Sequence, residues 1–114
     1  MRPQVFTLDL TDDPQLIAQY RTWHQPGALP PAIVAGLRAV GVTEMEIFLS
    51  GNRLVMILLT SNEFSSRALA ELTASNAEFQ AWETLMWKFQ KALPWAQQGE
   101  KWVAMDRIFA LSEH

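Results

Sequence analysis

The segment from Leu54 to Leu59 (LVMILL) is an unbroken apolar run, and it constrains the fold more than any other part of the sequence. A run this short that follows the turn residues Ser50, Gly51 and Asn52 predicts a buried β-strand. An antiparallel strand with one face in water would alternate apolar and polar residues, so both faces of this strand must be covered. In a chain of 114 residues, one layer of helices covers one face, and a second subunit is needed for the other. We therefore expect a homodimer.

Helices and strands are predicted on both sides of this strand. Asp13-Pro14 and Pro30-Pro31 are typical of helix starts, and Gly41 is typical of a helix end. The strands are expected at 5–10, 44–49, 53–60 and 102–111, and the helices at 14–25, 31–40, 63–73 and 76–93. This order, β-α-α-β-β-α-α-β in a single domain (1–114), predicts an α+β fold of the ferredoxin-like sandwich type.

The last two helices carry recognisable start and stop signals. Asn62 is the expected cap of the helix over 63–73. Ser75 and Glu78 are predicted to form a capping box, in which the serine oxygen accepts from a backbone N–H and the glutamate reaches back. The next helix ends before Pro94 and has an apolar stripe at spacings of three and four. This stripe consists of Phe79, Trp82, Met86, Phe89 and Leu93.

The composition excludes several classes of function. The chain has nine Lys and Arg against twelve Asp and Glu, so it lacks the basic surface of a nucleic-acid-binding protein. It has no Cys, which excludes disulfides, thiolate chemistry and cysteine-based metal sites. No apolar run approaches the roughly 18 residues of a membrane span, and Asp9 interrupts the apolar stretch near the N-terminus. We expect a cytoplasmic protein without a signal peptide and without nucleic-acid or membrane partners.

His24 is the main candidate for acid–base chemistry near neutral pH, because the second histidine, His114, is the last residue of the sequence. Tyr20 precedes His24 by four residues, which places both side chains on one helical face. A tyrosine hydroxyl and an imidazole side by side could bind a polyhydroxylated ligand and move its protons. Alternatively, His24 only caps the end of its helix, where a partly positive ring is favoured.

Two further groups of residues are candidates for a sugar site. Trp82, Glu83 and Trp87 combine aromatic planes, which stack on C–H faces, with a carboxylate, which accepts from hydroxyl groups. Trp82 alone also fits a purely structural role in the apolar stripe. Glu44 and Glu46 share one face of a strand, either as an acid–base pair or as an ordinary solvated face.

The sequence has no glycine-rich phosphate loop, His-x-x-x-His pair, Gly-x-Ser-x-Gly motif or acidic metal cluster. A single candidate histidine does not make a zinc site without carboxylates around it. These features leave metal-free and cofactor-free proton transfer, or simple binding, as the remaining functions.

Residues 20–27 (YRTWHQPG) carry a Y-x-x-x-H motif, and the segments EMEIF at 44–48 and GNRL at 51–54 follow it. Together with WETLMW at 82–87 and GEKW at 99–102, these segments resemble the L-rhamnose mutarotase family. The last two segments are similar to a subgroup described as L-rhamnose or L-fucose mutarotase-like. The resemblance spans nearly the whole chain.

The resemblance implies a homodimeric α/β barrel that interconverts the α and β anomers of a 6-deoxyhexose without a cofactor. In the family, the histidine that matches His24 is the proposed proton donor, and the tyrosine that matches Tyr20 binds sugar. A family tryptophan pair begins at Trp82, and its second position is occupied by Glu83 here. A further sugar-binding tyrosine of the family falls at Met45.

We therefore predict a mutarotase in which His24 is the acid at the ring oxygen and Tyr20 orients the sugar. Trp82 and Trp87 would stack on the apolar face of the sugar, and a glutamate would contact hydroxyl groups or act as the base. The predicted sugar-binding residues are Tyr20, Met45, Glu46, Trp82, Glu83 and Trp87.

One departure from the family pattern affects the expected substrate. Where the family has W-P-E, this chain has Pro30, Pro31 and Ala32, so the tryptophan and the glutamate are lost. If that tryptophan shapes the pocket, the protein prefers a different sugar or has weak activity. L-Rhamnose and L-fucose both remain open as substrates. The alternatives are a non-catalytic sugar-binding or structural dimer and a small dimeric ferredoxin-like monooxygenase.

Overall fold

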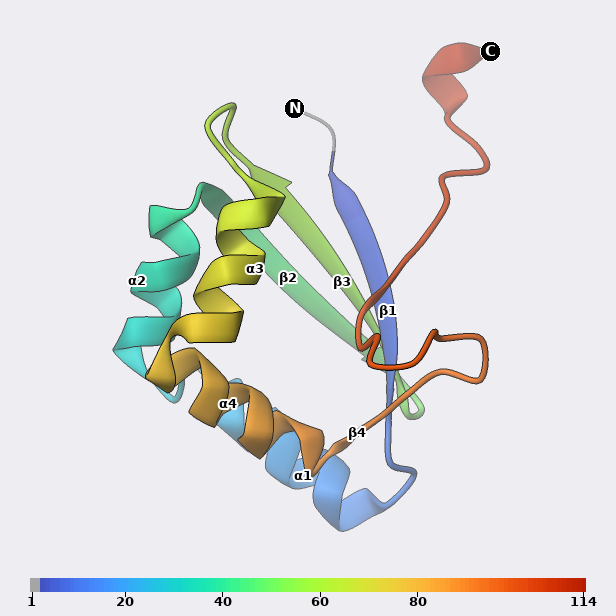
Figure 1. Cartoon of the computed structure of the whole chain (residues 1–114). Coiled ribbons are helices and arrows are strands. Elements are labelled where there is room, and N and C mark those ends of the chain that lie inside the picture. The colour runs from blue at the N-terminus through green and yellow to red at the C-terminus, as the bar shows by residue number, and fades with distance from the viewer. Residues whose placement is uncertain (1–2) are drawn as a thin grey trace.

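The computed structural model describes residues 3–114 and has an antiparallel sheet covered by helices. The elements in chain order are β1 (Gln4–Leu10), α1 (Pro14–Trp23), α2 (Pro31–Ala39), β2 (Val42–Ser50), β3 (Arg53–Thr60), α3 (Ser66–Ser75), α4 (Ala77–Trp87), β4 (Gln90–Lys91), β5 (Val103–Ala104) and a 3-10 turn (Leu111–Glu113). The strand order is β2-β3-β1-β4, and β5 also pairs with β1. Within the described residues all four α-helices lie on one side of the sheet (Figure 1), which confirms the predicted α+β fold.

The first two helices begin where the sequence predicts. The Asp13 carboxylate accepts hydrogen bonds from the backbone N–H groups of Gln15 (2.8 Å) and Leu16 (3.2 Å), so it satisfies N–H groups that have no partner inside the helix. Pro14 and Pro31 occupy the first helical positions, where their missing N–H costs nothing. None of the helices within residues 3–114 is long and apolar enough to cross a membrane.

The predicted start of the third helix is wrong by three residues. Ser65, not Asn62, is the cap of α3, and its hydroxyl oxygen accepts from the N–H of Ala68 at 3.0 Å. The segment before it is a turn closed by a hydrogen bond from Phe64 N to Ser61 O at 3.1 Å. This turn keeps Asn62 out of the helix start.

The predicted capping box of the fourth helix is also wrong. Asn76 is the cap of α4, because its side-chain oxygen accepts from the N–H groups of Glu78 (2.9 Å) and Phe79 (3.1 Å). Ser75 is still the last residue of α3, and its hydroxyl donates back to the carbonyl of Glu71. Only Asn76 has the extended backbone that a cap needs (φ −85°, ψ 124°).

Two predicted elements are shorter than expected. Helix α4 ends at Trp87 rather than near Pro94. Phe89 and Leu93 are buried as predicted, but they belong to the segment that follows the helix. The last strand covers only Val103–Ala104 of the predicted 102–111, because β1 offers it two pairing positions and the chain then leaves the sheet. The predicted order therefore gains the short strand β4.

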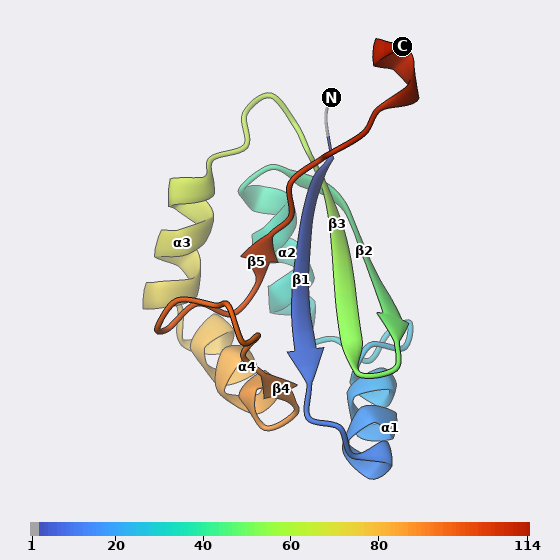
Figure 2. The ribbon, with the colours of Figure 1, turned by 90° about the vertical axis from the view of Figure 1, so that its right-hand side faces the viewer.

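The two faces of β3 differ in their environment. Leu54, Met56 and Leu58 point to the helices and are almost completely buried. The alternate residues of β3 lie on the other face, where they are only partly buried and where Phe48 of β2 is 53% exposed. Figure 2 shows the strands with α2 behind them and with α3 and α4 beside them. The helices of one chain thus cover only one face of β3, whereas the sequence predicts that both faces of this strand are covered.

Helix α2 packs very closely on α4 at Gly36. A Cβ atom at this position would lie 2.5 Å from Cε1 and 2.8 Å from Cζ of Phe79, whose side chain is only 3% exposed. We expect Gly36→Ala to lower the free energy of unfolding by about 1–2 kcal/mol, because an overpacking cost of about 2–3 kcal/mol outweighs a helix-propensity gain of about 1 kcal/mol. Urea denaturation followed by circular dichroism measures the change.

The same substitution in a Phe79→Leu background is the control, since the smaller side chain leaves room for the new methyl group. There the penalty for Gly36→Ala should largely disappear. A Gly36→Ala single variant as stable as the native chain would contradict this close packing.

Candidate active site

His24 ends helix α1 and caps it with its ring. Its backbone N–H donates to the carbonyl of Arg21 at 3.1 Å, and its ring Nδ1 lies 2.7 Å from the carbonyl oxygen of Tyr20. A carbonyl oxygen only accepts hydrogen bonds, so Nδ1 must carry the proton. In the neutral ring, Nε2 then holds the free lone pair. The cap therefore fixes the tautomer of the imidazole.

The surroundings of His24 favour the neutral ring. Burial lowers the pKa of His24 below its ordinary value of 6.5, and the hydrogen bond to the Tyr20 carbonyl opposes this effect only in part. At pH 7 the ring is consequently neutral. A neutral imidazole with Nδ1 held by a carbonyl presents Nε2 as a base.

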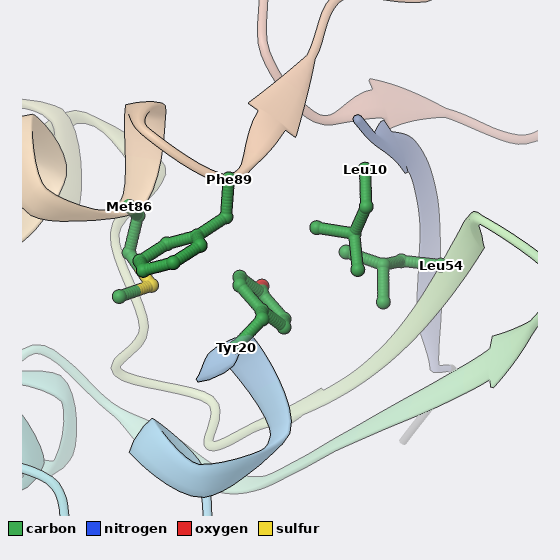
Figure 3. Packing of buried hydrophobic residues seen from close by; sticks show 5 residues of the cluster. All are labelled: Leu10, Tyr20, Leu54, Met86 and Phe89. Carbon is green, nitrogen blue, oxygen red and sulfur yellow. The ribbon is translucent and has the colours of Figure 1, made fainter. Parts of the chain in front are cut away.

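Tyr20 lies under the imidazole and belongs to the core. Its side chain is 4% exposed and packs among Leu10, Leu54, Met86 and Phe89, as Figure 3 shows. The centres of the Tyr20 and His24 rings are 4.3 Å apart at an angle of 31°. Helical spacing brings the two rings together, and the core fixes the lower one.

The Tyr20 hydroxyl accepts from the side-chain amide of Gln90 at 3.5 Å, a long hydrogen bond. Burial raises the pKa of Tyr20 to about 12, the Gln90 amide opposes the rise, and the negative charge of Glu83 adds to it. The phenol is thus protonated at neutral pH and serves as a hydrogen-bond donor rather than as a base. Gln90 lies on β4, outside every motif in the sequence, and was not predicted.

Trp82 reaches the imidazole from helix α4. Its ring meets the His24 ring edge to face, with 5.7 Å between the ring centres, and it meets the Trp23 ring in the same way at 6.1 Å. Aromatic pairs in this geometry are favourable beyond the area they bury. The structure therefore brings together three predicted residues, His24, Tyr20 and Trp82, and adds Trp23.

A cavity of about 340 Å³ opens beside His24. This volume lies at the lower end of the range for small-ligand sites, about 300–1,000 Å³, and suits a monosaccharide. The predicted residue Met45 lines the cavity, whereas Arg38 of α2 was not predicted. The other lining residues come from the loop before α2, from α2 and from β2: Leu29, Val34, Leu37, Val42, Thr43, Glu44 and Ile47.

Glu83 and Trp87 are joined by a lysine that was not predicted. The Lys101 ammonium forms an ion pair with the Glu83 carboxylate and lies 4.6 Å from the centre of the Trp87 ring. The Lys101 side chain is 16% exposed. Glu83 and Trp87 are therefore neighbours, as their spacing predicts, but Lys101 already occupies the carboxylate. The matched segment GEKW was the signal that could have pointed to this lysine.

The two glutamates of β2 have different positions. Glu44 lines the cavity, and its carboxylate accepts from the N–H of Met45 at 3.0 Å. Glu46 is exposed between Met45 and Ile47, and Ile47 packs toward the core around Tyr20, so Glu46 points to the opposite face of the sheet. The structure does not bring Glu46 to His24. Within residues 3–114, no three or more His, Asp or Glu side chains gather as metal ligands would.

The chain matches known proteins over almost its whole length. Residues 4–111 match the family model described as L-rhamnose mutarotase. An L-fucose mutarotase from Xanthomonas campestris pv. campestris is 50% identical over 113 residues, which cover 99% of this chain and 90% of that protein. The crystal structure of an L-rhamnose mutarotase from Formosa agariphila has the same fold, with a TM-score of 0.66 and 18% identity over 97% of this chain and 99% of that chain. The chain belongs to the L-rhamnose mutarotase family.

Proposed function

We propose that this chain converts the α and β anomers of L-fucose into one another by acid–base ring opening and closure. Family membership makes the chain a mutarotase, an isomerase that acts on sugars. The choice of L-fucose over L-rhamnose is supported by the relative at 50% identity, an L-fucose mutarotase. The L-rhamnose mutarotase at 18% identity supports the fold alone. The family also favours an isomerase over the monooxygenase alternative.

The anchored imidazole of His24 is the observation that carries the mechanism. Neutral Nε2 takes the proton from the anomeric hydroxyl, the bond between C1 and the ring oxygen breaks, and the aldehyde forms. The imidazolium then gives this proton to the ring oxygen, which is the acid role predicted from the sequence. Rotation about the C1–C2 bond and the reverse transfers close the ring as the other anomer.

One histidine is sufficient for this reaction because both oxygens are bonded to C1. The proton therefore moves a short distance, and the imidazole returns to its neutral state after each opening. Mutarotation already proceeds in water, so general acid–base help of about 10²–10⁴-fold is an adequate contribution. The carbonyl of Tyr20 holds Nδ1 throughout and keeps Nε2 directed at the sugar.

The other residues shape and orient the substrate. The Trp82 ring beside His24 offers a surface for the apolar C–H face of the sugar. Tyr20 is buried in the core and does not line the cavity, so it orients the reaction through the carbonyl that holds the His24 ring. Met45 gives the cavity an apolar wall at the position of a family tyrosine, and it suits the methyl group of a 6-deoxy sugar. Glu83 and Trp87 do not line this cavity, and the Glu83 carboxylate is paired with Lys101, so their contact with the sugar stays a prediction.

The functional molecule is a homodimer in which two ferredoxin-like sandwiches form an α/β barrel. The helices cover one face of the sheet, while the other face carries apolar residues such as Ile57 and Phe48 that stay partly or largely exposed. A second copy that packs its own open face against this face buries Ile57 and Phe48. Isologous pairing of this kind is common in homodimers.

Replacing His24 should abolish most of the activity. We expect His24→Ala to lower the enzymatic rate of anomer exchange of L-fucose by about 10²–10⁴-fold, because the proton carrier is lost. NMR exchange spectroscopy between the two anomeric proton signals measures the rate. Added imidazole should restore part of it, which a merely misfolded variant would not show. L-Rhamnose in the same assay should give a lower kcat/KM than L-fucose.

His114→Ala is the matched control, because His114 is the other histidine of the chain and stacks only on exposed Phe109. Its rate should equal that of the native protein. Native-like exchange by His24→Ala would refute the role of His24, and a higher kcat/KM for L-rhamnose would refute the substrate.

The enzymatic rate should also depend on pH in one direction. Since burial lowers the pKa of His24 below 6.5 and the neutral ring is the active form, kcat/KM should be constant above that pKa and fall as pH drops through it. The profile is measured by NMR exchange after subtraction of the uncatalysed rate at each pH. A kcat/KM that rises toward acid pH would show that the imidazolium, not the imidazole, starts the reaction.

A further inference from the structure

The cavity beside His24 has a second polar end that the proposed mechanism does not use. Besides His24, its lining residues with polar side chains are Arg38, Thr43 and Glu44, and all three lie where α2 ends and β2 begins. Helix α2 runs from the segment after α1 to the start of β2 (Figure 1). Further along β2, Ile47 lines the cavity and packs toward the core around Tyr20. His24 and the three polar residues therefore lie at opposite ends of the cavity.

Helical spacing turns Arg38 toward the cavity. Val34 precedes it by four residues and lines the same cavity, so both side chains share one face of α2. Arg38 lies roughly 10 Å along the helix axis from Pro31, at a rise of about 1.5 Å per residue. Within α2 it is the one polar side chain. The helix dipole favours a cation in the last turn, but it does not require a cation on the cavity face.

Arg38 and Glu44 carry opposite charges at the same cavity and are not paired with each other. Neither belongs to an ion pair within residues 3–114. The Glu44 carboxylate accepts from the N–H of Met45 at 3.0 Å, and this hydrogen bond holds it at the cavity wall.

The two groups are complementary to a hydroxyl group. A guanidinium only donates hydrogen bonds and a carboxylate only accepts them, whereas a hydroxyl does both. One hydroxyl placed between Arg38 and Glu44 can therefore accept from the first and donate to the second. The opposite charges also cancel, which suits a neutral sugar better than an anionic one.

We propose that Arg38, together with Glu44, binds the C4 hydroxyl of the sugar and determines which sugar the enzyme accepts. The inference rests on the proposed function, in which His24 acts at C1 and at the ring oxygen. C4 lies across the pyranose ring from C1. A sugar that has its anomeric end at His24 therefore directs C4 toward the other end of the cavity.

The configuration at C4 separates the two candidate substrates. The C4 hydroxyl is axial in L-fucose and equatorial in L-rhamnose, and the two sugars also differ at C2. A donor and an acceptor in fixed positions reach the hydroxyl of one configuration and leave the other poorly bonded, which is how a polar site discriminates between sugars. Arg38 thus supplies a physical reason for the proposed preference for L-fucose.

The test compares L-fucose with 6-deoxy-L-glucose, because these sugars differ only at C4. NMR exchange spectroscopy gives kcat and KM for each sugar. We expect the native kcat/KM to be at least about tenfold higher for L-fucose. Arg38→Met keeps an apolar side chain on the wall and removes the donor. It should lower kcat/KM for L-fucose by about tenfold, mainly through KM, and leave 6-deoxy-L-glucose almost unchanged.

Three further variants separate a contact with the sugar from a structural effect. Arg38→Lys keeps a cationic donor and should restore most of the preference, whereas Glu44→Met removes the acceptor and should reduce the preference. Arg67→Met is the matched control, because Arg67 is exposed on α3 and pairs with Glu71, and it should behave like the native chain.

An unchanged preference in Arg38→Met would overturn the inference. An equal loss of kcat/KM for both sugars would also overturn it, because that result shows a structural role alone. The native protein separates the two proposals. Native exchange of L-fucose without a preference over 6-deoxy-L-glucose refutes the role of Arg38, whereas the absence of any native L-fucose exchange refutes the proposed function and this inference with it.

Discussion

The hydrogen bond from His24 Nδ1 to the carbonyl of Tyr20 is the interaction on which the site depends. It occupies a carbonyl at the end of α1 that has no partner within the helix, and it fixes the proton on one ring nitrogen. The capping role of His24 and the acid–base role that we propose for it, which look like alternatives in the sequence, are therefore compatible in one arrangement. Without the cap, the ring could rotate and the basic nitrogen would have no fixed direction.

Tyr20 connects this hydrogen bond to the sheet. Its backbone holds the imidazole, and its ring is buried against Leu10 of β1, Leu54 of β3 and Phe89. His24 itself is only partly buried, and this burial lowers its pKa. The strands that fix Tyr20 in the core thus also fix the carbonyl that holds the proposed base, His24.

Local patterns in the sequence predicted the features that depend on local interactions. Helical spacing placed Tyr20 beside His24, and the apolar run predicted β3 with its observed limits, Arg53–Thr60. Predictions failed where distant contacts decide. Lys101 reaches Glu83 from a loop 18 residues away.

The length of the last strand depends on how many of its residues pair with β1. The position of Glu46 depends on which face of β2 the helices cover. Such facts require the tertiary arrangement.

The measurement that tests the account most directly is ¹⁵N–¹H NMR of the His24 imidazole across a pH titration. We predict that Nδ1 carries the proton in the neutral ring, that Nε2 does not, and that the pKa of His24 lies below 6.5. A neutral ring protonated on Nε2, or a pKa of His24 above 6.5, would contradict the account.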